Sequence, residues 1–109
     1  MKFLMGIIAA VAVMLTNQAF AIDKVNMAAG QALAEKSNCL ACHKVEGKLV
    51  GPGFKDVSNK YKGDKKAEDM LIAKVTMGGA GVWGTIPMPP NAAVKPTDVK
   101  TLVKWVMAN

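Results

Sequence analysis

The sequence Cys39-Leu40-Ala41-Cys42-His43 places two thiols and one imidazole within five residues. This C-x-x-C-H spacing is typical of a c-type haem attachment site. Each cysteine is then expected to form a thioether with one haem vinyl group, and His43 to ligate the iron from one side. The motif therefore predicts one covalently bound haem c, held through Cys39 and Cys42, around which the rest of the chain folds.

Two other kinds of site use closely spaced cysteines. A thioredoxin-like disulfide belongs in a βαβ context, which the helical pattern of this chain does not provide. A structural zinc ion takes four nitrogen or sulfur ligands. Cys39 and Cys42 are the only cysteines and His43 is the only histidine, so such a site would lack a ligand. Haem attachment is the interpretation that the motif favours.

Residues 1–21 have the layout of a cleaved secretory signal peptide. Lys2 precedes an almost unbroken apolar run at 3–15, and Ala19-Phe20-Ala21 resembles a cleavage site. The run is shorter than the roughly 20 residues that span a bilayer. We therefore expect export to the periplasm, no stable membrane insertion after cleavage, and one domain at 22–109.

Lysine supplies all of the positive charge. Lys and Arg together number 14 against 8 acidic residues, for a net charge of +6, and no arginine is present. A basic surface suits redox proteins with an acidic docking face and acts mainly on association rate. Lysines scattered over the surface would equally serve solubility. Nucleic acid is not an expected partner, because the chain has neither arginine nor a recognised binding motif.

The spacing of apolar residues predicts an all-α domain with four to five helices wrapped around the haem. The expected elements are a helix at 25–36, a helical turn at 39–43, and helices at 54–61, 67–77 and 95–107. Asp64 is the expected N-cap of the 67–77 helix. Leu71, Val75 and Met70 are expected on the inner face of that helix.

The expected helix at 25–36 is rich in alanine. Its apolar spacing predicts an inner face made of Val25, Ala28, Ala29, Ala32 and Leu33. Gly30 and the alanines are small enough for a second helix to approach closely.

Residues 78–91 cannot form a regular element, because they hold four glycines and three prolines. Trp83, Ile86 and Met88 favour a packed loop. Prolines on both sides of Met88 stiffen the backbone around it. With no second histidine in the chain, Met88 is the predicted ligand on the other side of the iron. The remaining methionines after the predicted cleavage site are expected to be core filler: Met27, Met70, Met77 and Met107.

Five short sequences resemble the small bacterial class I cytochromes c of the c551/c552 type. They are Cys39–His43, Val50-Gly51-Pro52, Gly81-Val82-Trp83-Gly84, Ile86-Pro87-Met88-Pro89-Pro90-Asn91 and Lys104-Trp105-Val106. The resemblance covers essentially all of residues 22–109. It implies the class I cytochrome c fold and a low-spin iron with His43 and Met88 as its two ligands.

The resemblance also implies supporting residues. The Pro52 carbonyl would accept a hydrogen bond from His43 and fix the orientation of its ring. Trp83 would hydrogen-bond a haem propionate, and Asn91 would approach Met88. Lys74 stands where some family members place an arginine near a propionate. The first and last helices would cross closely, with Gly30 opposite Leu102 and Trp105.

The expected function is that of a soluble, monomeric one-electron carrier. It would pass electrons from a quinol-oxidising complex to a terminal reductase or oxidase. Two strong axial ligands would leave the iron no vacant position. A haem peroxidase or a gas sensor needs an open position, so neither class is favoured, and no enzymatic activity is expected.

Overall fold

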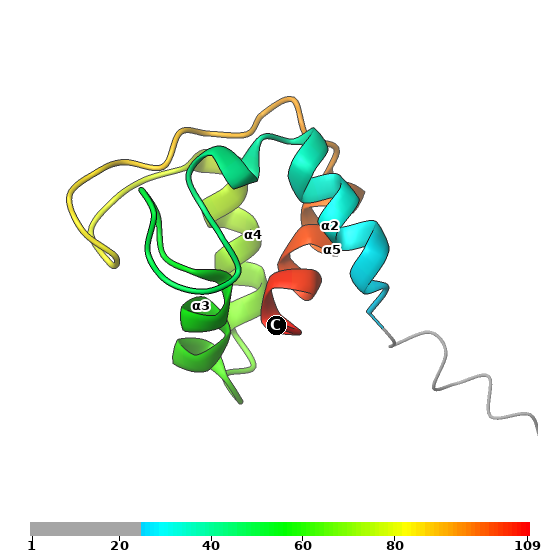
Figure 1. The fold of residues 1–109 in the computed structure, drawn as a ribbon, viewed down its shortest axis with the longest axis horizontal. Helices are drawn as coiled ribbons and strands as arrows, with labels where there is room; N and C mark the ends of the chain where they lie inside the picture. Colours follow the sequence, from blue (N-terminus) through cyan, green and yellow to red (C-terminus); the bar gives the residue numbers. More distant parts are fainter. Residues whose placement is uncertain (1–24) are drawn as a thin grey trace, which may run out of the picture.

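The computed structural model describes residues 25–109, and the predicted signal peptide at 1–21 lies outside this range. Within the described residues the chain forms four α-helices and one short 3-10 helix (Figure 1). The elements are α2 (Met27–Lys36), η1 (Cys39–Ala41), α3 (Phe54–Tyr61), α4 (Ala67–Met77) and α5 (Pro96–Met107). The predicted all-α class is confirmed, and no boundary differs from the predicted ranges by more than two residues.

Helix α5 is the centre of the packing. It contacts α2, α3 and α4, which surround it (Figure 1). Pro96 occupies the first turn, where its missing N–H costs no helical hydrogen bond. The buried side chains recur at helical spacing: Val99, Leu102, Val103 and Trp105. Every other helix therefore depends on the apolar stripe of α5 for its core contacts.

The crossing of α2 and α5 brings Gly30 against Trp105. Trp105 is only 2% exposed. A Cβ atom added at Gly30 would lie 2.5 Å from the Cβ of Trp105 and would also overlap its indole ring. The predicted close crossing at Gly30 and Trp105 is therefore present.

The predicted inner face of α2 is correct for Val25 and Leu33, which pack against the core, and wrong for its three alanines. Ala28, Ala29 and Ala32 are exposed, whereas Gly30 and Ala34 are buried. In an alanine-rich helix several faces have similar apolar spacing, so the sequence does not show which face is buried. The size of the partner side chain determines which face packs against it. Here the indole of Trp105 packs against the face that carries Gly30, because only glycine leaves room for it.

The starts of two helices differ from expectation. Helix α2 begins after Asn26, whose Oδ1 accepts a hydrogen bond of 3.0 Å from the Ala29 N–H. Asp64 is not the N-cap of α4, since that position belongs to Lys66. The Asp64 carboxylate instead accepts from the Lys66 N–H at 2.9 Å and stabilises the turn before the helix.

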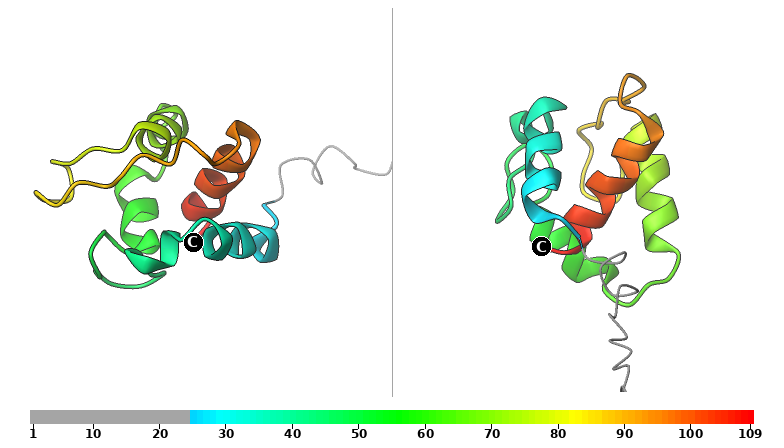
Figure 2. Two further views of the ribbon diagram at one scale, coloured as in Figure 1. Left: turned by 90° about the horizontal axis from the view of Figure 1, so that it is seen from above. Right: turned by 90° about the vertical axis from the view of Figure 1, so that its right-hand side faces the viewer.

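Two long loops extend on the same side of the helices, as the left view of Figure 2 shows. One follows η1 and runs to residue 53, and the other occupies 78–95. The second loop is closed at its base by mutual backbone hydrogen bonds between Gly79 and Met88, of 3.0 and 2.8 Å. None of the helices in residues 25–109 has the length and apolar character needed to cross a bilayer.

The tip of the 78–91 loop lies away from the helical core. Ile86 is 64% exposed and Trp83 is also exposed, because both side chains line an open cavity instead of the helical core. Three of the methionines expected to be core filler are exposed as well: Met27, Met70 and Met77. Core packing is supplied by the valines, Leu102, Phe54 and Trp105. Met27 and Met77 lie outside this core, and Met70 lines the open cavity.

Candidate functional site

The two long loops and helices α3, α4 and α5 enclose a cavity of about 440 Å³. Most of its wall is apolar, including Val50, Val57, Leu71 and Val75. The residues with haem chemistry that also line it are Cys39, Cys42, His43, Trp83 and Met88. The structure therefore brings to one cavity side chains that are up to 49 positions apart in the sequence.

The cysteines and the histidine are presented together by η1. Asn38 adopts a left-handed conformation with φ of 60°, which ends α2 and turns the chain into η1. The Cys39 carbonyl then accepts from the N–H groups of Cys42 and His43 at 3.2 and 2.9 Å. Both thiols are free. Burial raises the pKa of the Cys39 thiol, which favours its uncharged form.

One nitrogen of His43 is committed to a hydrogen bond. Its Nδ1 lies 2.8 Å from the carbonyl oxygen of Pro52. Because a carbonyl can only accept, Nδ1 carries the proton and donates it. The neutral ring then has its lone pair on Nε2, which is the form that ligates a metal. This is the contact between His43 and Pro52 that the family resemblance implied.

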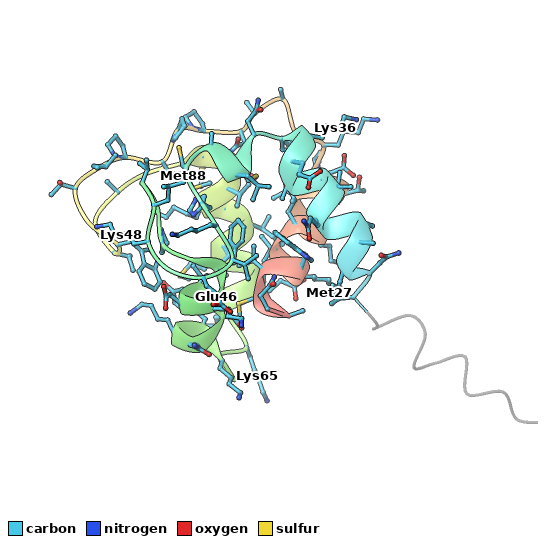
Figure 3. All side chains as sticks on the ribbon, in the orientation of Figure 1. Met27, Lys36, Glu46, Lys48, Lys65 and Met88 are labelled. Atoms are coloured by element: carbon cyan, nitrogen blue, oxygen red, sulfur yellow. The ribbon has the colours of Figure 1, made fainter. Side chains whose placement is uncertain are left out.

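Met88 is held to the end of α4 by backbone contacts. Met88 forms the paired backbone bonds to Gly79 described above. Asn91 adds a second attachment of the loop to α4, because its backbone N–H and its side-chain amide both donate to the Val75 carbonyl, at 3.2 and 3.0 Å. Gly78, with φ of 72°, allows the loop to pass close by, since an added Cβ would lie 2.9 Å from the Pro89 carbonyl carbon. Figure 3 labels Met88 on this loop and Lys48 on the facing loop.

The other predicted site residues have different positions. Trp83 lines the cavity, and the Lys60 ammonium lies 5.7 Å from the centre of its ring. Lys74 also lines the cavity. Asn91 does not belong to the cavity wall, and acts instead on the loop that carries Met88.

The sequence patterns did not single out two contacts of His43. Phe54 stacks on its ring, and the backbone of Gly51 lies against its edge. Gly51 belongs to the Val50-Gly51-Pro52 sequence that carries the family resemblance, and Phe54 begins the next helix, but neither pattern predicts contact with the imidazole.

The donor set fits haem c. A flat, largely apolar cofactor needs an apolar cavity, two thiols for its vinyl groups, and nitrogen or sulfur ligands for its iron. Residues of η1, of the two loops and of the surrounding helices supply all of these. Across residues 25–109 no three His, Cys, Asp or Glu side chains are grouped so that they could hold a metal ion on their own.

Comparison with known proteins agrees with this chemistry. The family model described as Cytochrome c matches residues 27–109. The chain is 56% identical to cytochrome c-551 of Allochromatium vinosum over 75 residues, which is 69% of this chain and 80% of that protein. The crystal structure of cytochrome c552 from Nitrosomonas europaea is similar with a TM-score of 0.69 and 47% identity, covering 72% of this chain and 96% of that one. The class 1 cytochrome MtoD from Sideroxydans lithotrophicus is similar with a TM-score of 0.68 and 32% identity, covering 78% and 97%.

Proposed function

We propose that His43 and Met88 are the two ligands of the haem iron in this chain. The proposal starts from the family to which the chain belongs, cytochrome c, in which it is a class I monohaem cytochrome of the c551/c552 type. It carries one haem c attached through Cys39 and Cys42, and it is an electron carrier and not an enzyme. The haem supplies the one-electron couple. The polypeptide determines which ligands, charges and solvent surround it.

The observation that carries the proposal is that His43 and Met88 lie on the two loops that border one apolar cavity. His43 has its Nε2 lone pair available because Nδ1 donates to Pro52. Met88 is fixed at the base of its loop by the backbone bonds to Gly79. Two residues held independently in this way keep the same positions in both oxidation states, which favours fast electron transfer over substrate binding.

Redox proteins are its partners, and we propose that they present an acidic face near the exposed edge of the cavity. Lys48 lines the cavity from the loop after η1 and is exposed. In the proposed route, the protein carries electrons from a quinol-oxidising complex to a terminal reductase or oxidase. It does so in the periplasm, as a monomer from which the signal peptide at 1–21 has been cleaved. This route requires export, which the sequence of that segment favours.

Visible absorption of the haem-loaded protein tests the ligand assignment. We expect a low-spin ferric spectrum with a long-wavelength band from Met ligation, lost in Met88→Ala. Met77→Ala is the matched control, because Met77 is 70% exposed and does not line the cavity. Both variants should still give a positive pyridine haemochrome test for covalent attachment. A high-spin ferric spectrum in the unsubstituted protein would contradict the assignment.

The docking surface is tested by the salt dependence of electron transfer to an identified partner. If lysines at the cavity edge steer association, the second-order rate falls as ionic strength rises. Lys48→Gln should lower this rate at low salt more than Lys100→Gln, which removes an exposed lysine of α5 that does not line the cavity. Equal effects of the two substitutions would mean that only net charge matters.

A further inference from the structure

We propose that Gly51 and Phe54 form a slot that fixes the rotation of the His43 imidazole, and that they are therefore positioning residues for the haem ligand on that side. The proposal rests on the assignment of His43 as a ligand. Its basis is that the hydrogen bond to Pro52 restrains the ring at Nδ1, and by itself leaves the plane of the ring free to tilt about that contact.

Phe54 restrains one face of the imidazole. The two ring centres are 5.3 Å apart and the rings are inclined by 25°, which is a stacked arrangement. Phe54 is itself buried and meets Trp105 edge to face, at 5.0 Å and 66°. Trp105 in turn fills the crossing of α2 and α5 against Gly30. The wall behind His43 is therefore part of the helical core and cannot tilt independently.

Gly51 leaves the space that the edge of the imidazole occupies. A Cβ atom at this position would lie 2.8 Å from Nδ1 and 3.0 Å from Nε2, and would overlap Cε1. Those distances are shorter than any ordinary contact of a carbon with a ring, so the absence of a side chain is what leaves room for the histidine. Gly51 does not have a positive φ, so this contact and not backbone strain sets its preference for glycine.

The backbone at Gly51 cannot easily move away from the ring. Its N–H donates to the Cys42 carbonyl at 2.7 Å, and its carbonyl accepts from the Leu49 N–H at 3.1 Å. At the end of the same loop, the Phe54 N–H donates to the Lys44 carbonyl at 2.9 Å. Both parts of the slot are thus tied to the segment around His43, and an added methyl group would displace the ring.

The rotation of an axial imidazole matters because its plane sets how its π orbitals overlap with those of the iron, and contacts beyond the ligands tune a metal site in this way. In the ferric state the spread of the EPR g-values and the order of the haem methyl ¹H shifts depend on the orientation of the ligands, so a rotation of the His43 ring with Met88 unchanged alters both. These readouts do not require an electron-transfer partner and are insensitive to a general loss of stability.

The test compares two slot variants with one buried control in the haem-loaded protein. Gly51→Ala pushes the ring and Phe54→Leu removes the stacking plane while keeping apolar volume. Ser58→Ala is the control, since Ser58 is buried on the same helix as Phe54 but bonds the Met107 carbonyl and does not line the cavity. We expect both slot variants to change the g-value spread and the methyl shifts well beyond any change in the control. Signatures that stay within the range of the control would overturn the proposal.

Two further measurements keep the outcomes separate. His43 is the only histidine, so histidine labelled with ¹⁵N in its ring gives one assignable pair of imidazole signals. Strong paramagnetic shifts of these signals support His43 as the ligand, and their absence overturns the ligand assignment itself. If Gly51→Ala does not accumulate with haem, Phe54→Leu decides, because it introduces no overlap.

Discussion

Replacing Gly30 by alanine separates two opposed effects of known size. Glycine inside a helix is less favourable than alanine by about 1 kcal/mol, so local propensity predicts that Gly30→Ala stabilises α2. The structure predicts the opposite, because the new Cβ would lie 2.5 Å from the Cβ of Trp105 and overlap its ring. Overpacking of a core typically costs about 1–3 kcal/mol. Trp105 is 2% exposed and has no room to rotate away, so the upper end of that range applies. The net expectation is a loss of about 2 kcal/mol in the free energy of unfolding, after the gain in propensity.

For a domain of this size such a loss lowers the melting temperature by about 8–16 °C. Thermal unfolding of the haem-loaded protein, followed by far-ultraviolet circular dichroism, measures it. Ala32→Gly is the matched control on the exposed face of α2, where propensity acts alone and about 0.5–1 kcal/mol should be lost. Shortening the partner in Gly30→Ala/Trp105→Leu should make the alanine substitution less harmful than it is opposite Trp105. A Gly30→Ala protein as stable as the parent, or more so, would refute the crossing geometry.

Other substitutions test single contacts. Asn91→Ala removes the hydrogen bond from the side-chain amide to the Val75 carbonyl of α4, while the backbone N–H of residue 91 still donates to that carbonyl. Chemical denaturation should therefore show a loss of only about 0.5–1.5 kcal/mol in the free energy of unfolding. Ser58→Ala leaves a part-buried carbonyl of α5 without its 2.9 Å donor, and about 1–3 kcal/mol should be lost in the same assay. The Lys55 ammonium, which hydrogen-bonds Glu46 and attracts its charge, lowers the pKa of that carboxyl below its ordinary value of 4.5. A lowered pKa contributes stability above the unfolded value and loses it as pH falls through the folded value. Glu46→Gln should therefore be slightly less stable than the parent at neutral pH and equal to it in strong acid, and the difference should be small because both groups are exposed.

Most of the fold could be predicted because residues next to each helix mark where it begins or ends. Glycines follow α4, Pro96 begins α5, and the apolar stripe of α5 has strict helical spacing. The buried face of α2 could not be predicted in the same way, because alanine and glycine carry too weak a hydrophobic signal to orient a helix. The position of Ile86 in the cavity wall could not be predicted for a related reason, since an apolar residue in a loop does not reveal whether it faces a core or a cavity.

The haem-binding chemistry of this protein can be read from its residues alone. Covalent attachment requires two thiols and an adjacent imidazole at a fixed local spacing, and proline-framed Met88 is a stiff segment wherever it lies. The orientation of these groups depends on how the chain folds in three dimensions. Four contacts join residues between 8 and 11 positions apart through loop closure. They are the bond from His43 to Pro52, the stacking of Phe54 on His43, the approach of Gly51 to His43 and the pairing of Met88 with Gly79. The packing of Phe54 on Trp105 and of Trp105 on Gly30 spans most of the domain. Such contacts depend on shape and distance in three dimensions, and no local pattern of residue types encodes them.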